Sequence, residues 1–165
     1  METTTIRALQ NKLFDGAVFP HVKKSGIGVV IRDYKGLVIA SCSKLVHQEL
    51  CSNDIEAVAA GWALSFALEV GVKRAVLEGD SLIVIKGLIE EERLLVPLGL
   101  LVEDAKNLFQ RFDELLYSHI KRECNTLAHS TASYAIGIPN FLVWMEDVPP
   151  QSHDVLQADL LGLSE

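Results

Sequence analysis

The first half of the chain alternates short apolar runs with turn residues. Residues 26–33 (GIGVVIRD) and 37–45 (LVIASCSKL) are rich in the β-branched side chains that favour strands. Between them, Asp33 and Gly36 occupy the first and last positions of a type I turn, which predicts a hairpin. A third strand is predicted over 13–19 (LFDGAVF). Three consecutive strands of this kind predict an antiparallel meander.

Segments with helical periodicity follow this meander. Residues 53–70 carry a broad apolar stripe between Asn53, a good N-cap, and Gly71, a common helix stop. The remaining predictions are strands over 74–80 and 114–122, a helical segment over 81–90, and helices over 97–112 and 125–136. Strands that are reached through helices can pair in parallel, so this order predicts an α/β fold with a mixed sheet covered by helices.

The last part of the chain has a different composition from the rest. After Arg122 there are six acidic residues and no Lys or Arg, whereas residues 1–122 hold 15 basic and 16 acidic side chains. Residues 137–165 have little regular pattern, and we expect them to cover a groove or to stay partly mobile, with one short amphipathic helix over 154–163. The predicted organisation is therefore an N-terminal extension (1–11), one domain (12–136) and an acidic C-terminal tail (137–165).

Several classes of protein are disfavoured by the sequence. The most apolar segment, 81–102, is interrupted by Lys86 and by the charged run 90–93, so we expect no membrane span. The first residues lack the apolar region of a secretory signal. Three cysteines without paired spacing indicate neither a disulfide framework nor a zinc site. These features predict an intracellular protein, nuclear or cytoplasmic, without a membrane partner.

Three acidic residues lie where a strand or helix could aim a carboxylate. Asp15 is on the first predicted strand before Gly16, Glu56 is near the start of the best predicted helix, and Asp80 ends a buried strand. Each also has a structural interpretation. Glu56 completes a capping-box pattern with Asn53, Asp80 could cap the next helix, and Asp15 could be a surface acid in a turn.

A histidine occupies a comparable position near the start of the last predicted helix. His129 follows Asn125 by four residues and precedes Ser133 by four, so the three share one polar helical face. His119 is interpreted as a packed or partly exposed strand residue. No GxSxG or phosphate-binding loop accompanies these residues, and the glycines of SGIGVV are better explained by close backbone packing.

The ordered set of motifs resembles one family. DGA (15–17), GIGVVIRD (26–33), VLEGDS (76–81) and SHIKRECNTLAHSTAS (118–133) occur in the order and approximate spacing of ribonuclease H. More closely, the chain is similar to ribonuclease H-like domains derived from plant non-LTR retroelements, over about residues 12–136. The resemblance implies a ribonuclease H-like fold with a five-stranded mixed sheet, the first three strands antiparallel, flanked by helices.

The same resemblance implies a catalytic site. In this family four residues hold two Mg²⁺ ions, and the matching positions here are Asp15, Glu56, Asp80 and, in place of the last Asp, His129. Nitrogen is a poorer ligand for Mg²⁺ than for Mn²⁺, so we expect weakened or Mn²⁺-favouring activity. The strand segment NKLFDGA is also one residue shorter than the family pattern, which puts in question the face that Asp15 takes.

The substrate implied is the RNA strand of an RNA–DNA hybrid, with double-stranded RNA as another ligand. The residues expected to contact it are Gly16, Lys23, Lys24, Arg122 and Asn125. The acidic segment 90–97 lies where bacterial relatives carry a basic protrusion, so binding should be weak and salt-dependent.

Two alternative functions remain at this point. One is a nucleic-acid-binding module without turnover, and the other is a domesticated retroelement-derived domain for protein interaction. No particular protein partner is predicted.

Overall fold

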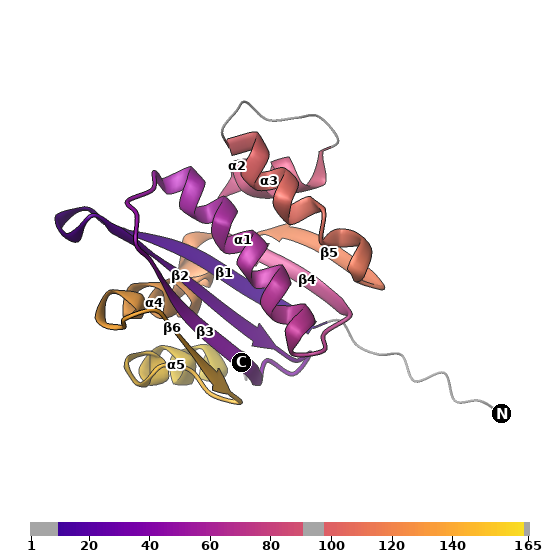
Figure 1. The fold of residues 1–165 in the computed structure, drawn as a ribbon. Coiled ribbons are helices and arrows are strands. Elements are labelled where there is room, and N and C mark those ends of the chain that lie inside the picture. The colour runs from indigo at the N-terminus through magenta and orange to yellow at the C-terminus, as the bar shows by residue number, and fades with distance from the viewer. Residues whose placement is uncertain (1–9, 91–97, 164–165) are drawn as a thin grey trace.

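The protein is built on a mixed sheet of six strands, seen in a computed structural model that describes residues 10–163 except 91–97 (Figure 1). The strands are β1 (Gln10–Phe19), β2 (Lys24–Arg32), β3 (Val38–Val46), β4 (Arg74–Gly79), β5 (Glu114–His119) and β6 (Phe141–Met145). Their order across the sheet is β5-β4-β1-β2-β3-β6. The strands β1, β2 and β3 form the predicted antiparallel meander. Next to β1, β4 pairs in parallel with β1, and β5 pairs in parallel with β4.

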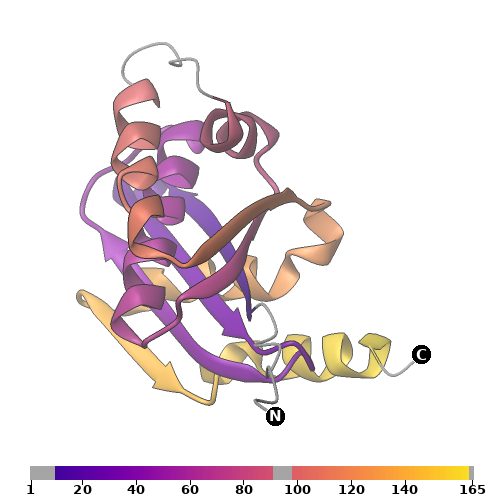
Figure 2. The same cartoon turned by 90° about the vertical axis from the view of Figure 1, so that its right-hand side faces the viewer.

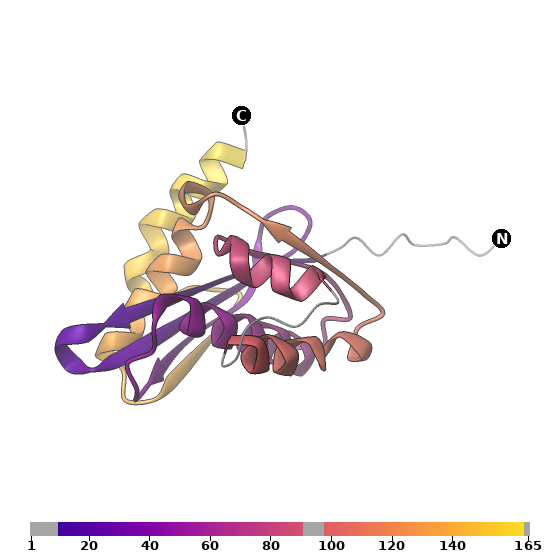
Figure 3. The ribbon, with the colours of Figure 1, turned by 90° about the horizontal axis from the view of Figure 1, so that it is seen from above.

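Helices cover both faces of this sheet (Figures 1, 2 and 3). They are α1 (Ser52–Glu69), α2 (Leu82–Ile89), α3 (Leu98–Lys106), α4 (Thr126–Tyr134) and α5 (His153–Leu163). The helix α1 packs on one face, against the main apolar core, and α4 packs on the other face. None of the helices among the described residues is long and apolar enough to cross a membrane.

The alternation of side chains along β2 explains the two layers. Ile27, Val29 and Ile31 point into the core beneath α1, whereas Gly26 and Gly28 face α4. A Cβ atom on Gly28 would lie 2.4 Å from the carbonyl oxygen of Ala128 in α4. The helix therefore packs directly on the strand backbone, which confirms the packing interpretation of these glycines.

The sheet has one strand more than predicted. The additional strand, β6, comes from the segment in which we expected little regular structure, and it pairs antiparallel with β3. Its sequence FLVWM is short and apolar at every position, so it lacks the alternation that identifies a half-buried strand. Further along the same segment, α5 confirms the predicted short helix. The C-terminal segment thus adds an edge strand and a helix to the body of the protein.

Two predicted helix boundaries differ from the structure. The helix α1 begins at Ser52, with Cys51 as its N-cap, so Asn53 lies inside the helix. The helix α3 ends at Lys106, and only a single 3₁₀ turn (Phe109–Arg111) follows before β5. The predicted start at Pro97 lies outside the described residues. Helix ends are the least certain feature of a sequence pattern, because caps and turns compete for the same residues.

Candidate functional site

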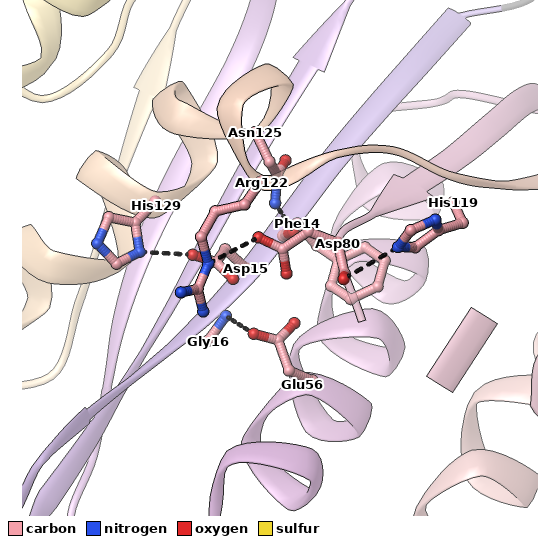
Figure 4. A network of polar contacts seen from close by, with 9 residues as sticks. All are labelled: Phe14, Asp15, Gly16, Glu56, Asp80, His119, Arg122, Asn125 and His129. Carbon is pink, nitrogen blue, oxygen red and sulfur yellow. Dashed lines mark hydrogen bonds and ion pairs between the residues drawn. The ribbon is translucent and has the colours of Figure 1, made fainter. Parts of the chain in front are cut away.

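Three carboxylates meet near the middle of the sheet (Figure 4). Asp15 comes from β1, Glu56 from α1, and Asp80 follows the end of β4. One carboxylate oxygen of each lies within 4.8 Å of the corresponding oxygens of the other two. Asp15 and Glu56 are buried, and Asp80 is partly exposed. Such a set of oxygens is suited to a hard divalent cation.

The strand pairing explains why Asp15 and Asp80 are neighbours. The parallel pairing of β1 with β4 runs from Gln10↔Ala75 to Leu13↔Glu78 and then stops. Continuing this register by two residues brings Asp15 opposite Asp80, where the two strands separate. The carboxyl ends of parallel strands are the usual place for functional groups in such sheets. The short form of the first strand has not moved the acid: Phe14 points into the core and Asp15 points to the site.

Glycines let the third element approach the other two. A Cβ atom on Gly16 would lie 2.8 Å from the side chain of Ile55, so α1 can pack closely against β1 only at a glycine. At this contact the Gly16 N–H donates a hydrogen bond to Glu56 Oε1 over 3.2 Å. Gly79 is required in the same way, because a Cβ atom there would lie 2.4 Å from the Phe14 ring.

The structural interpretations of all three acids are wrong. Asp15 is buried within β1 and is not a surface acid in a turn. Glu56 is the fifth residue of α1, beyond the capping position, and it accepts its hydrogen bond from Gly16 in another element. Asp80 does not cap α2, because Ser81 is the N-cap and no side chain bonds to that helix end. Both carboxylates therefore point to the shared site and do not cap the two helices.

Crowding of like charges changes the acidity of the site. Burial first, and then the neighbouring carboxylate of Asp15, raise the pKa of Glu56 to about 10. Burial and then the charge of Asp15 also raise the pKa of Asp80. Glu56 Oε2 is buried without a hydrogen-bond partner. Without a cation, the site therefore holds a proton at neutral pH.

His129 lies beside Asp15. Its Nδ1 atom is 2.8 Å from Asp15 Oδ2, and its side chain is 61% exposed. When Asp15 is ionised, the Nδ1–H group donates this hydrogen bond. The ring thus reaches the site from α4, but among the described residues the group that could enclose one cation comprises only the three carboxylates.

Asn125 is buried, which corrects its predicted position on a solvated helix face. Its Nδ2 atom donates a hydrogen bond to the carbonyl oxygen of Phe14 over 3.0 Å. A hydrogen bond from the same side chain lowers the pKa of Asp80. Asn125 therefore links the start of α4 to β1 and β4, and its contact with substrate stays a prediction.

The other residues predicted to contact substrate lie at different distances from the carboxylates. Gly16 is in the site, and Arg122 Nε is 3.9 Å from Asp80 Oδ2 with its side chain 88% exposed. Lys23 and Lys24 lie at the turn between β1 and β2. Phe19, the last residue of β1, is already about 13 Å along the strand from Asp15, so the two lysines can act only on an extended ligand.

His119 also lies beside the site, although its place in the sequence indicated only a packed or partly exposed strand residue. It ends β5, is exposed, and its Nε2–H group donates a hydrogen bond to the carbonyl oxygen of Asp80 over 3.2 Å. The signal was present in the predicted parallel pairing, because Gly79 and His119 are direct partners across β4 and β5. A residue at the end of one parallel strand lies beside the end of its neighbour.

Comparison with known families identifies the type of domain. The model of the reverse transcriptase-like family matches residues 13–135. Among proteins with curated functions, none matches the chain.

Solved structures give a consistent result. The chain is similar to RNase H1 from the archaeon Halobacterium salinarum NRC-1, with 26% identity, a TM-score of 0.72, and coverage of 78% of this chain and 97% of that one. It is also similar to LC11-RNase H1, isolated from compost by a metagenomic approach, with 25% identity, a TM-score of 0.71, and coverage of 79% and 96%. A second structure of LC11-RNase H1 contains an RNA/DNA hybrid. The chain therefore belongs to the reverse transcriptase-like family, and its fold is that of ribonuclease H.

Proposed function

We propose that the protein is a divalent-metal-dependent endonuclease that cleaves the RNA strand of RNA–DNA hybrids. The observation that carries this proposal is the meeting of Asp15, Glu56 and Asp80, from three separate elements, with oxygens within 4.8 Å of one another. The similarity to RNase H1 proteins, one of them solved with an RNA/DNA hybrid, supports the substrate. The family match supports an origin in a retroelement.

The residues present fit a divalent cation. Glu56 Oε2 is buried and lacks a partner, and the raised pKa values of Glu56 and Asp80 reflect acids that crowd one another. A cation bound by Asp15, Glu56 and Asp80 would relieve both defects. When bound, a pair of such ions activates a water for attack on the phosphodiester and stabilises the leaving oxygen.

His129 is proposed as a ligand at the second ion position, next to Asp15. His129 Nδ1 lies 2.8 Å from Asp15 Oδ2, so an ion held by Asp15 could also be bound by the ring. The ring must lose its Nδ1 proton to ligate, and nitrogen suits Mn²⁺ better than Mg²⁺. This position should therefore favour Mn²⁺.

Two exposed side chains at the rim are proposed to act on the substrate. The Arg122 guanidinium, beside Asp80, can contact a phosphate of the strand that enters the site. His119 is held by its Nε2–H bond to the Asp80 backbone, which leaves Nδ1 free to exchange a proton with solvent or with the leaving oxygen. Recognition would rest on duplex shape and 2′-hydroxyl contacts.

Cleavage of a labelled RNA–DNA hybrid tests the proposal. The native chain should produce RNA fragments with Mg²⁺ or Mn²⁺ and none with EDTA. Asp80→Asn should lower the rate by at least about a thousandfold, because it removes a charge that holds the cation. Asp104→Asn, an exposed acid on α3, is the matched control and should leave the rate unchanged. Absence of cleavage, or equal rates for native chain and Asp80→Asn, would contradict the proposal.

A second candidate function is hybrid binding without turnover. The observation that favours it is the histidine at a position where the family has an acid. This candidate predicts a salt-sensitive mobility shift of the hybrid and no products with either metal. Cleavage that depends on Asp80 would exclude it.

A further inference from the structure

The strand β6 forms an outer edge of the sheet, beside β3 (Figures 1 and 2). Its five residues are all apolar, and four are exposed: Phe141 by 49%, Leu142 by 43%, Val143 by 43% and Met145 by 61%. The opposite edge strand, β5, has only one large apolar side chain, Leu116, exposed to this degree. Edge strands normally carry a charge, a proline or a bulge that prevents further pairing. The five residues of β6 include neither a charged residue nor a proline.

The hydrogen bonds on its inner side define which backbone groups face outward. Leu45 N–H donates to the Asn140 carbonyl over 2.7 Å, and Glu146 N–H donates to the Ile39 carbonyl over 2.8 Å. In an antiparallel pair the groups that face the partner alternate along the strand. The even-numbered residues therefore bond to β3. The N–H and C=O groups of Phe141, Val143 and Met145 point away from the sheet.

We propose that a second copy of this chain binds here, through antiparallel pairing of β6 with β6 about a twofold axis at Val143. In this register Val143 lies opposite Val143 of the second copy, and Phe141 lies opposite Met145. Every outward N–H and C=O group of the three residues finds a partner, which gives six hydrogen bonds. An isologous contact of this kind closes as a dimer and leaves no further β6 edge.

The side chains also match in this register. Phe141 and Met145 project to the same face, so the thioether of one copy reaches the aromatic ring of the other. That ring already contacts Trp62, with centroids 6.3 Å apart, and Lys44 Nζ lies 5.7 Å from its centroid. No like charges meet within the five paired residues.

Sedimentation velocity over a range of concentrations tests the proposal. The native chain should associate reversibly to a dimer, and only weakly, because the interface is small. Val143→Lys places two like charges opposite each other at the axis and should abolish the dimer. Leu116→Lys on β5 is the matched control and should leave the dimer intact.

A second variant separates loss of pairing from loss of folding. Val143→Pro removes only an N–H group that faces outward, so the bonds to β3 persist while the dimer is lost. Circular dichroism should show an unchanged fold in both Val143 variants. A native chain that stays monomeric at 200 μM overturns the proposal. A dimer that survives Val143→Lys in a folded protein overturns it as well, because the contact must then lie elsewhere.

Discussion

Phe14 and Asp15 are neighbours on β1, yet their side chains enter opposite environments. Phe14 is fully buried in the apolar core beneath α1, in contact with Gly79 of β4. Asp15 faces Glu56, Asp80 and His129. The buried side chain of Phe14 therefore stabilises the fold, whereas the buried carboxylate of the adjacent Asp15 destabilises it.

This difference shows how the two regions depend on each other. Crowded carboxylates repel, so the site by itself destabilises the fold. The core beneath α1 fixes the strands and the helix from which the acids project. Stability and chemistry should therefore be separable by substitution at adjacent positions.

The largest effect is expected from Phe14→Ala. Truncation of a fully buried Phe should lower the free energy of unfolding by about 3–5 kcal/mol, because it removes apolar contacts and leaves a cavity. Asp15→Asn should leave stability within about 1 kcal/mol of the native value while abolishing cleavage. Urea titrations of both variants, beside cleavage assays, check the comparison. A loss of stability in Asp15→Asn equal to that in Phe14→Ala would contradict it.

Gly28→Ala should have the next largest effect. The new methyl group would meet the backbone of α4 at 2.4 Å, so the helix that carries His129 must move away from β2. We expect a loss of about 1–3 kcal/mol, as for other overpacked sites. Gly71→Ala measures a different defect, since no atom lies within 4 Å of its Cβ and only the positive φ of 87° is strained. Thermal unfolding of both variants, with hybrid cleavage, separates clash from backbone strain. Normal cleavage and stability in Gly28→Ala would contradict the close packing of α4.

Glu56→Gln should stabilise the protein in the absence of metal. The pKa of Glu56 is about 10 in the folded protein, against an ordinary value of 4.5. Below pH 4.5 Glu56 is protonated in both the folded and the unfolded state, so its carboxyl group does not change the stability. Between these values only the folded state holds the proton, so stability falls as pH rises. Glu56→Gln removes this slope, and at pH 6 the gain should be about 2 kcal/mol. Melting temperatures in EDTA from pH 4 to 9 check this, and parallel curves for the two proteins would contradict it.

His129→Asp should have the smallest effect and the opposite sign on activity. An acidic oxygen suits Mg²⁺ better than an imidazole nitrogen does, so Mg²⁺-supported cleavage should rise by about tenfold. The ratio of Mn²⁺ to Mg²⁺ rates should fall. His21→Asp, in the turn between β1 and β2, controls for the added negative charge. An unchanged metal preference in His129→Asp would place His129 outside the cation site.

The fold was predictable wherever the pattern of side chains was strong. The β2–β3 hairpin and α1 carry clear periodicities, and the structure confirms both. Within the C-terminal segment β6 was not predictable, because a run of five apolar residues does not reveal its partner. Its place at the sheet edge depends on long-range pairing with β3.

The candidate site was predictable in its residues but not in its contacts. The motifs singled out Asp15, Glu56 and Asp80, and the structure brings these three together. The burial of Asn125 and the place of His119 depend on how α4 and β5 pack, which a local pattern does not contain. A polar residue such as Asn125, which has the spacing of an exposed helical face, can still be buried at the start of the helix.

Calorimetric titration of the protein with Mn²⁺ measures the cation site without reference to any substrate. We expect saturable binding to the native chain with release of protons, since Glu56 must ionise. Asp15→Asn should lose that binding, and Asp104→Asn should retain it. Absence of binding to the native chain, or equal binding by Asp15→Asn, would contradict the claim that these carboxylates form a metal site.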